Sequence, residues 1–172
     1  MSGTRVTALV ALGSNLGDRL AHMQAGLAGV RALPDTRISA VSALYETAPV
    51  GGPDNQGPYL NAAVALDTGL AAGDLLARLH GIEAAELRER RIRWGARTLD
   101  LDLLIHGDLV SADPDLSVPH PRLHERRFVM VPIVDVAPDL SHPVLNRSMA
   151  ALLADLPVEP GDLTRVAETW GN

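Results

Sequence analysis

The chain has 172 residues, a length typical of one domain, so we expect a single domain over residues 1–172. Apolar residues make up 47% of the chain and charged residues 21%, a composition that excludes an intrinsically disordered protein. The net charge of −6 argues against a general nucleic-acid-binding protein, and the absence of cysteine excludes disulfides, thiolate metal sites and thiol nucleophiles.

Two further features concern location and phosphate binding. The N-terminus has no apolar run that fits a secretion signal, and no segment approaches the ~20 apolar residues of a membrane span, so a cytoplasmic protein without a membrane partner is expected. All 15 basic residues are arginine, which excludes a P-loop lysine and Schiff-base chemistry. Any side-chain cation that contacts phosphate must therefore be an arginine.

In chain order, the first predicted element is a strand over the apolar residues 6–12. A glycine-rich turn follows, and Asp18 is placed to cap a helix whose apolar residues recur from Leu20 to Val30, until Pro34 ends the pattern. A second strand is expected over residues 38–47. Residues 48–58 contain three prolines and three glycines and predict a long surface loop of the kind that often serves binding.

The second half of the predicted core has the same order of strand, helix and strand as the first half, without a sequence repeat. Residues 59–67 indicate a strand, residues 72–87 a helix, and residues 99–105 a fourth strand. The order strand, helix, strand, strand, helix, strand is that of a ferredoxin-like α+β domain, with two helices on one face of an antiparallel sheet. C-terminal additions are expected: short helical pieces over 119–138 interrupted at Pro132, a helix over 148–156, and short strands.

The fourth strand carries two acids. Alternation sends Leu99, Leu101 and Leu103 to one face, and it places Asp100 and Asp102 together on the other. Magnesium accepts one or two carboxylates and completes its octahedron with water and phosphate oxygens, so this pair is a candidate metal site. The alternative is an exposed strand face with solvated acids.

Five arginines precede these acids within ten residues, and Trp94 lies among them: Arg88, Arg90, Arg91, Arg93 and Arg97. Guanidinium groups suit phosphate oxygens, and an indole ring can stack on a flat base. The alternative is a solvated helix end whose arginines pair with Glu83, Glu86 and Glu89. His120 also attracts attention, because it lies between Pro119 and Pro121 near further arginines. The string Gly13–Asp18 could hold an anion, but a turn and helix cap is the favoured interpretation.

Several strings together resemble the 6-hydroxymethyl-7,8-dihydropterin pyrophosphokinases of folate biosynthesis. They are ALGSNLGD at 11–18, residues 45–64, RWGARTLDLD at 93–102, VPHP at 118–121 and residues 126–128. The match spans nearly the whole chain in the same order. It implies one pyrophosphokinase domain in which the pterin hydroxymethyl oxygen attacks the β-phosphorus of ATP, so that AMP leaves. The implied partners are ATP and 6-hydroxymethyl-7,8-dihydropterin, with two magnesium ions; a monomer without a nucleic-acid partner is expected.

The resemblance also assigns roles by position. The implied catalytic residues are Arg88, Arg97, Asp100 and Asp102, of which Asp100 and Asp102 are the implied metal ligands. The implied ATP contacts are His80, Glu83, Arg90, Arg93, Trp94, Leu103, Ser117, His120, Pro121 and Arg126. The implied pterin contacts are Thr47, Ala48, Val50, Tyr59, Asn61, Trp94 and Phe128.

Some positions depart from the pattern of this family, namely Leu87, Ala96, Ala48 and Asp115. No residue is identified as a general base: solvent, a metal-bound hydroxide or a carboxylate could take the proton. A magnesium-dependent nucleotidyltransferase is the nearest alternative enzyme, although its Gly-Ser turn would lie close before the acids. A ferredoxin-like RNA-binding module is a further alternative, disfavoured because the chain has only five aromatic residues and is acidic.

Overall fold

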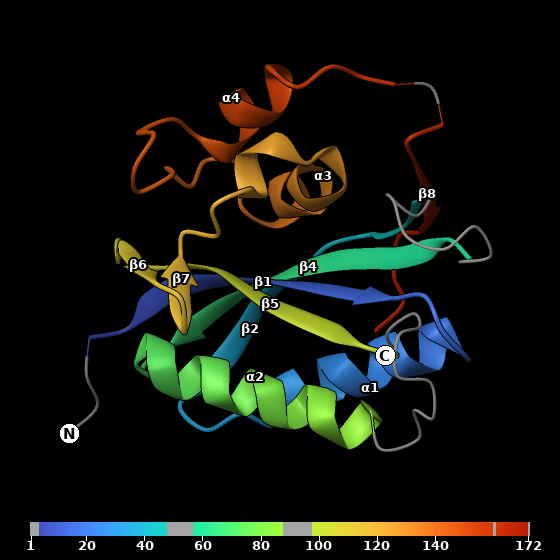
Figure 1. Ribbon diagram of the computed structural model, residues 1–172, viewed down its shortest axis with the longest axis horizontal. Coiled ribbons are helices and arrows are strands. Elements are labelled where there is room, and N and C mark those ends of the chain that lie inside the picture. The colour runs from blue at the N-terminus through green and yellow to red at the C-terminus, as the bar shows by residue number, and fades with distance from the viewer. Residues whose placement is uncertain (1–3, 48–56, 88–97, 160, 172) are drawn as a thin grey trace.

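The computed structural model describes residues 4–47, 57–87, 98–159 and 161–171. These residues form a six-stranded antiparallel sheet covered by helices on both faces (Figure 1). The strands of this sheet are β1 (Val6–Ser14), β2 (Thr36–Val41), β3 (Leu44–Thr47), β4 (Tyr59–Thr68), β5 (Asp100–His106) and β8 (Leu163–Ala167). The helices are α1 (Arg19–Arg31), α2 (Ala72–Leu87), α3 (Arg127–Val136) and α4 (Met149–Ala154). A separate hairpin consists of β6 (Ser111–Asp113) and β7 (Leu116–Val118), and a short 3-10 helix covers Leu123–Glu125.

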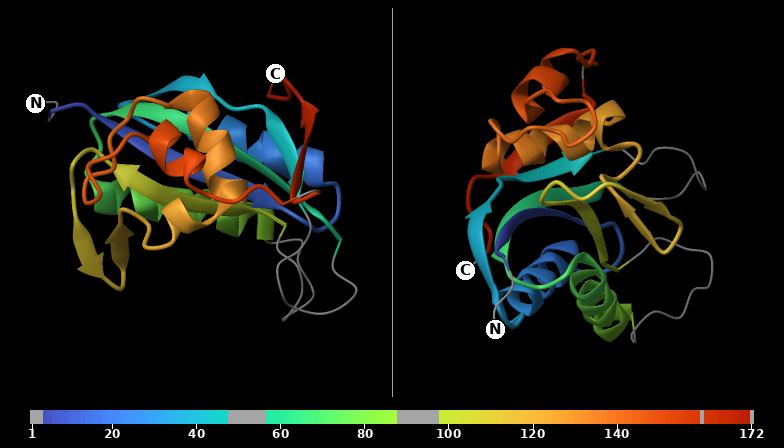
Figure 2. Two further views of the ribbon diagram at one scale, coloured as in Figure 1. Left: turned by 90° about the horizontal axis from the view of Figure 1, so that it is seen from above. Right: turned by 90° about the vertical axis from the view of Figure 1, so that its left-hand side faces the viewer.

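The predicted ferredoxin-like α+β arrangement is confirmed. The strands lie in the order β5-β1-β4-β3-β8, and β2 also pairs with β4. Helices α1 and α2 cover one face, as expected, while α3 covers the opposite face and α4 packs on the outer side of α3 (Figures 1 and 2). The C-terminal additions therefore enclose the sheet from its second side. None of the helices in the described part of the chain is long and apolar enough to cross a bilayer.

Strand β1 is apolar on both faces because each face has its own core. Val10 and Leu12 belong to the cluster between the sheet and α1 and α2, whereas Leu9 belongs to the cluster shared with α3 and α4. All three side chains are at most 1% exposed. A strand buried between two layers needs apolar residues at successive positions rather than at alternate ones. This explains the continuous apolar run at the start of the sequence.

The predicted second strand over 38–47 is divided into β2 and β3, which lie end to end along β4. Between them, the backbone N–H of Ser42 donates to Ala63 O at 2.9 Å, and Ser42 Oγ accepts from Ala63 N at 2.8 Å. The serine hydroxyl takes the place of a backbone acceptor in the ladder, which local side-chain bonding by serine allows. The strand pattern is thus interrupted without a change of direction.

Helix α3 differs from its prediction because Pro132 does not interrupt it. The helix continues from Arg127 to Val136 with Pro132 inside it, and the interruption expected there was wrong. Met130, Pro132 and Ile133 are buried, so packing against the sheet offsets the backbone hydrogen bond that a proline cannot donate. In α4, Ser148 caps the helix by accepting from Ala151 N at 3.1 Å, which agrees with the start expected at residue 148.

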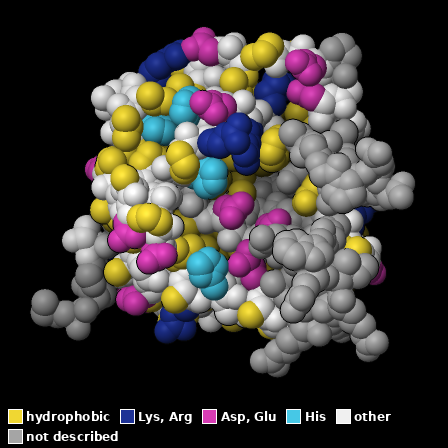
Figure 3. Space-filling view, in the orientation of Figure 1, with side chains coloured by type: hydrophobic (Ala, Val, Ile, Leu, Met, Phe, Trp, Pro, Cys, Tyr) yellow, Lys and Arg dark blue, Asp and Glu magenta, His cyan; other side chains and the backbone are white. Residues whose placement is uncertain are grey.

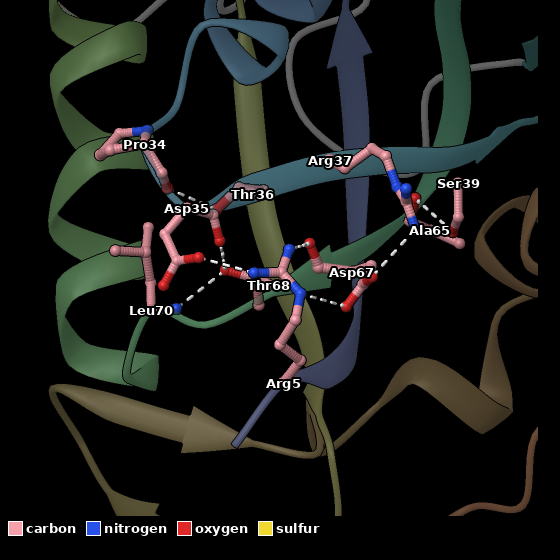
Figure 4. Close-up of polar contacts among 10 residues, drawn as sticks. All are labelled: Arg5, Pro34, Asp35, Thr36, Arg37, Ser39, Ala65, Asp67, Thr68 and Leu70. Atoms are coloured by element: carbon pink, nitrogen blue, oxygen red, sulfur yellow. Dashed lines mark hydrogen bonds and ion pairs between the residues drawn. The ribbon is translucent and has the colours of Figure 1, made fainter. Parts of the chain in front are cut away.

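Arg5 forms ion pairs at the end of the sheet that is farther from Asp100. Arg5 contacts Asp35 Oδ1 at 2.6 Å and Asp67 Oδ1 at 3.0 Å (Figure 4). Thr36 and Thr68 join their hydroxyls beside it at 2.8 Å. These contacts join the beginnings of β1 and β2 to the end of β4. The end of β1 and the beginning of β4, at the other end of the sheet, line a pocket.

Candidate active site

The two acids of β5 lie on the sheet face that α3 covers. Asp100 pairs with Gly13 and Asp102 with Ala11 on β1, and Gly13 in turn pairs with Asn61 on β4. Residues paired in this way point to the same face of a sheet. Asp102 is exposed and Asp100 is partly buried, while the leucines between and beside them are buried against α1 and α2. The alternation predicted from the sequence therefore places both carboxylates on one accessible face.

These acids open into a pocket of about 660 Å³, called here the larger pocket. Strands β1, β4 and β5 form its floor, and the segment leading into α3 forms its opposite wall. The space-filling view shows a hollow on this face, with acidic, basic and histidine side chains around it (Figure 3). Eight of the implied site residues line this pocket: Thr47, Tyr59, Asn61, Asp100, Asp102, His120, Arg126 and Phe128.

Asn61 has a fixed orientation within this pocket. Its Nδ2 donates to Thr47 Oγ1 at 2.7 Å. Its Oδ1 lies against Gly13, where an added Cβ would be 3.3 Å away. Because one amide end is held by a hydrogen bond and the other is confined by backbone, the amide presents a defined pattern of donor and acceptor groups. Such a group can read the edge of a flat heterocycle.

Phe128 and Arg126 form part of the opposite wall. The Arg126 guanidinium carbon lies 5.8 Å from the centroid of the Phe128 ring, within the range of a cation–π contact. Phe128 is the second residue of α3, so its ring and the positive end of the helix dipole lie in the same part of the wall. The wall combines an aromatic face with positive charge.

A second pocket of about 280 Å³, the smaller pocket, lies on the other side of Asp102. It is formed by α2, β5 and the β6–β7 hairpin. Five implied site residues line it: His80, Asp102, Leu103, Ser117 and His120. Asp115, noted as a departure from the family pattern, also lines it. Asp102 and His120 belong to both pockets, so they mark the place where the two spaces meet.

His120 is held at this junction by its own backbone and ring. Its N–H donates to Leu104 O at 2.8 Å, and its Nδ1 accepts from Arg122 N at 3.2 Å. Burial lowers the pKa of His120; Asp102 opposes that shift, and Arg126 and Arg122 add to it. A neutral ring that accepts at Nδ1 carries its proton on Nε2. His120 therefore presents a hydrogen-bond donor at the junction.

Among the implied nucleotide contacts that the structure describes, Glu83 and Pro121 line neither of these pockets. Glu83 Oε2 accepts from Leu101 N at 2.8 Å, which attaches α2 to the outer side of β5. Pro121 follows His120 but is exposed. The implied residues Ala48, Val50, Arg88, Arg90, Arg93, Trp94 and Arg97 lie outside the described residues, so their roles stay predictions.

The sequence did not assign several residues that line the larger pocket, among them Gly13, Arg122, Glu125 and Arg127. Gly13 begins the string that was interpreted as a turn and cap; Asp18 does cap α1, accepting from Ala21 N at 3.1 Å, but Gly13 itself lies in β1. The other three belong to the charged run 122–127, which adjoins His120 and Arg126 in sequence. Their closeness in sequence to His120 and Arg126 is the feature from which these three residues could have been predicted to line the pocket.

The acidic side chains of the site could hold a metal ion only if a bound substrate supplied further ligand oxygens. Within the described ranges, no three acidic or histidine side chains gather closely enough to hold a metal ion. The carboxylates of Asp100 and Asp102 are hard oxygen donors that line the larger pocket, and Asp102 also lines the smaller one. Magnesium is commonly held in this way, by one or two carboxylates together with substrate phosphates and water.

Comparison with known proteins gives consistent results. A family model described as 7,8-dihydro-6-hydroxymethylpterin-pyrophosphokinase (HPPK) matches residues 9–138. The 2-amino-4-hydroxy-6-hydroxymethyldihydropteridine pyrophosphokinase of Pseudomonas aeruginosa is 47% identical over 150 residues, covering 87% of this chain and 91% of the relative. The protein of the same name from Bacillus subtilis is 40% identical over 129 residues, covering 75% and 77%.

The fold is also found among solved structures. The crystal structure of wild-type Plasmodium falciparum HPPK-DHPS superposes with a TM-score of 0.68 at 16% identity. The superposition covers 88% of this chain and 44% of that longer chain. At this identity the likeness supports the architecture of the sheet and its helices.

Proposed function

Because this chain belongs to the 7,8-dihydro-6-hydroxymethylpterin-pyrophosphokinase family, we propose that it transfers pyrophosphate from magnesium-bound ATP to 6-hydroxymethyl-7,8-dihydropterin. The products are the pterin diphosphate and AMP. The observation that carries this proposal is the meeting of the larger and smaller pockets at Asp102 and His120. A transfer between two bound molecules needs adjoining sites with charged groups at their boundary.

The larger pocket suits the pterin. Asn61, fixed by Thr47, offers amide groups to the pterin edge, and Phe128 offers a ring for stacking. Tyr59 lines the same space. With the heterocycle held between floor and wall, its hydroxymethyl group would lie toward the acids of β5.

The smaller pocket suits part of the nucleotide. His80 and Ser117 line it as polar groups, and Leu103 contributes an apolar side chain. The His120 Nε2 proton lies at the boundary, where phosphate oxygens would accept it. Arg126 brings a permanent positive charge to the same boundary from the larger pocket. Arg88 and Arg97 remain proposed catalytic contacts on the strength of the resemblance.

Asp100 and Asp102 would hold the metal, and two magnesium ions are proposed with bound ATP. The ions would supply charge neutralisation of the triphosphate and alignment for in-line displacement. The accessible paired carboxylates fit this task, since the remaining ligands would come from phosphate and water. A cytoplasmic monomer is part of the same proposal, and the net charge of −6 supports the absence of a nucleic-acid partner.

The product distinguishes this function from its alternatives. Purified protein is incubated with ATP, magnesium and the pterin alcohol, and the nucleotide products are separated by chromatography. We expect AMP in amounts equal to the pterin consumed, and no AMP when the pterin is omitted or replaced by its 6-methyl analogue, which lacks the hydroxyl. Release of inorganic pyrophosphate instead would indicate a nucleotidyltransferase. Retention on immobilised RNA at moderate salt without turnover would favour an RNA-binding module.

A further inference from the structure

The C-terminal residues 161–171 lie beyond the part of the chain that the family model matches, which ends at residue 138. They return from α4 to the outer edge of the sheet, where β8 pairs with β3 (Figure 2). In this pairing Leu163 lies opposite Thr47, the residue that orients Asn61 in the larger pocket. Asp162 therefore adjoins in sequence the residue that pairs with Thr47, which lines the larger pocket.

Asp162 also contacts the opposite wall of the same pocket. Its Oδ2 lies 2.6 Å from Arg127 Nε, and the two side chains are 25% and 22% exposed. Arg127 is the first residue of α3 and lines the larger pocket between Arg126 and Phe128. One carboxylate thus connects the β3 side of the pocket to the helix that carries its aromatic wall.

The N-terminus of α3 lacks the side-chain interactions that usually stabilise the start of a helix. Its cap residue is Arg126, whose side chain makes no capping hydrogen bond, and its first turn has no acidic residue. Asp162 supplies the negative charge from elsewhere in the chain, at the end of the helix where the macrodipole favours it. A largely buried guanidinium without this carboxylate would turn toward solvent or into the pocket, because leaving it unpaired is costly.

The rest of the C-terminal segment holds Asp162 in place. The Trp170 Nε1–H donates to Ser42 O at 2.9 Å, and Gln24 Nε2 donates to Trp170 O at 2.7 Å. The Arg165 guanidinium carbon lies 5.9 Å from the centroid of the Tyr45 ring on β3. Trp170 is only 4% exposed, so the segment is anchored in the core beyond Asp162.

We propose that Asp162 is a positioning residue for the pterin site, which acts through Arg127 to hold Phe128 and the start of α3 against the floor of the larger pocket. This inference rests on the proposed function. It assigns to the C-terminal segment a part in substrate recognition, while no residue of this segment or of α3 lines the smaller pocket.

The test compares Asp162→Ala and Asp162→Glu with the wild-type enzyme. Asp155→Ala is the matched control, since Asp155 also pairs with an arginine, Arg147, but neither residue lines either pocket. KM and kcat are measured separately for the pterin and for ATP, with the melting temperature of each variant. We expect Asp162→Ala to raise the pterin KM about fivefold or more while kcat stays within about twofold, the pattern of lost substrate binding. The ATP KM should rise clearly less, because Arg126 adjoins Phe128 but the smaller pocket is built by other elements. Asp162→Glu, which keeps the charge, should recover part of this loss, and Asp155→Ala should match the wild type.

Two results would overturn the inference while the wild-type enzyme still forms AMP. In the first, the pterin KM of Asp162→Ala equals that of the wild type. In the second, the KM values for pterin and ATP rise by the same factor, which would indicate a general loosening of the fold. Absence of AMP from the wild-type protein would instead refute the proposed function itself, and this inference with it.

Discussion

Gly13 on β1 and Asn61 on β4 lie directly opposite each other on the floor of the larger pocket. A Cβ on residue 13 would come within 3.3 Å of Asn61 Oδ1, while Asn61 Nδ2 donates to Thr47 Oγ1 at 2.7 Å. The amide therefore has little room to move along the floor. Any side chain on residue 13 would have to displace it.

We predict that Gly13→Ala weakens pterin binding. The new methyl group pushes the Asn61 amide by a few tenths of an ångström and disturbs its contact with Thr47. The pterin KM should rise about threefold to tenfold with little change in the ATP KM, as for loss of part of one hydrogen bond. Gly73→Ala is the control, because its methyl group would meet no atom within 4 Å. An unchanged pterin KM in Gly13→Ala would remove Asn61 from the pterin site.

Replacement of Asp102 by alanine should abolish most of the pyrophosphoryl transfer. Asp102 is exposed and lines both pockets, so its carboxylate contributes to cation binding more than to the core. We expect turnover to fall by about 100-fold or more, with the free energy of unfolding changed by less than about 0.5 kcal/mol. AMP formation and urea unfolding measure the two effects. Asp108→Asn, in the exposed turn after β5, is the control and should keep full activity. Normal turnover in Asp102→Ala would refute the metal-binding role.

Asp135 and Tyr45 allow a prediction about stability. The Tyr45 hydroxyl donates to Asp135 Oδ2 at 2.5 Å, and Ala43 N donates to the same oxygen at 3.2 Å. Asp135→Ala leaves both donors without this acceptor and should cost about 1–3 kcal/mol, whereas Tyr45→Phe removes one donor and should cost about 1 kcal/mol. Urea unfolding of both variants gives the comparison. A larger loss in Tyr45→Phe than in Asp135→Ala would contradict this account of the pair.

His142 should make the stability depend on pH. Its Nδ1 accepts from the N–H groups of Val144 and Leu145, both at 3.1 Å, and its ring centroid lies 5.9 Å from that of His124. Burial lowers the pKa of His142, and His124 lowers it further. The unfolded chain thus takes up a proton near pH 6.5, and the folded chain only at lower pH.

Because the pKa of His142 is lower in the folded than in the unfolded chain, protonation of His142 decreases the free energy of unfolding. The contribution of His142 is fully present above about pH 6.5, and it is lost as the pH falls from there through the lower pKa of the folded state. Urea unfolding of the wild type and of His142→Asn over about pH 5–8 would measure it. Asparagine can accept similar hydrogen bonds but does not titrate, so its curve should be flatter on the acid side. Identical slopes in the two proteins would show that other groups cause the pH dependence.

Local patterns predicted the elements that depend on local physics. Apolar periodicity predicted the order of strands and helices in the ferredoxin-like core, and the cap at Asp18 marked the start of α1. Alternation along β5 placed Asp100 and Asp102 on one face, because successive side chains of a strand point to opposite sides. The resemblance added roles for these residues, and those roles remain predictions.

Other features could not be predicted because they depend on distant partners. The break between β2 and β3 at Ser42 depends on a hydrogen bond with Ala63 on β4. Helix α3 continues through Pro132 because this residue is buried in the core. Short C-terminal strands were expected, but β8 was not located, since a short exposed strand at an edge has almost no apolar alternation. Arg127 gave no sign of its place in the pocket wall, because its counterion Asp162 is 35 residues away.

The sequence alone determined which faces of each element are apolar, where the helices begin, and that two carboxylates share one strand face. These properties follow from the fixed geometry of strands and helices, which relates neighbouring residues directly. Only the tertiary structure decided that the larger and smaller pockets meet at Asp102 and His120, and that the C-terminal segment pairs with β3 and contacts Arg127 at the start of α3. Those relationships arise from strand register and layer packing, and a linear pattern does not specify which distant residues such packing brings together.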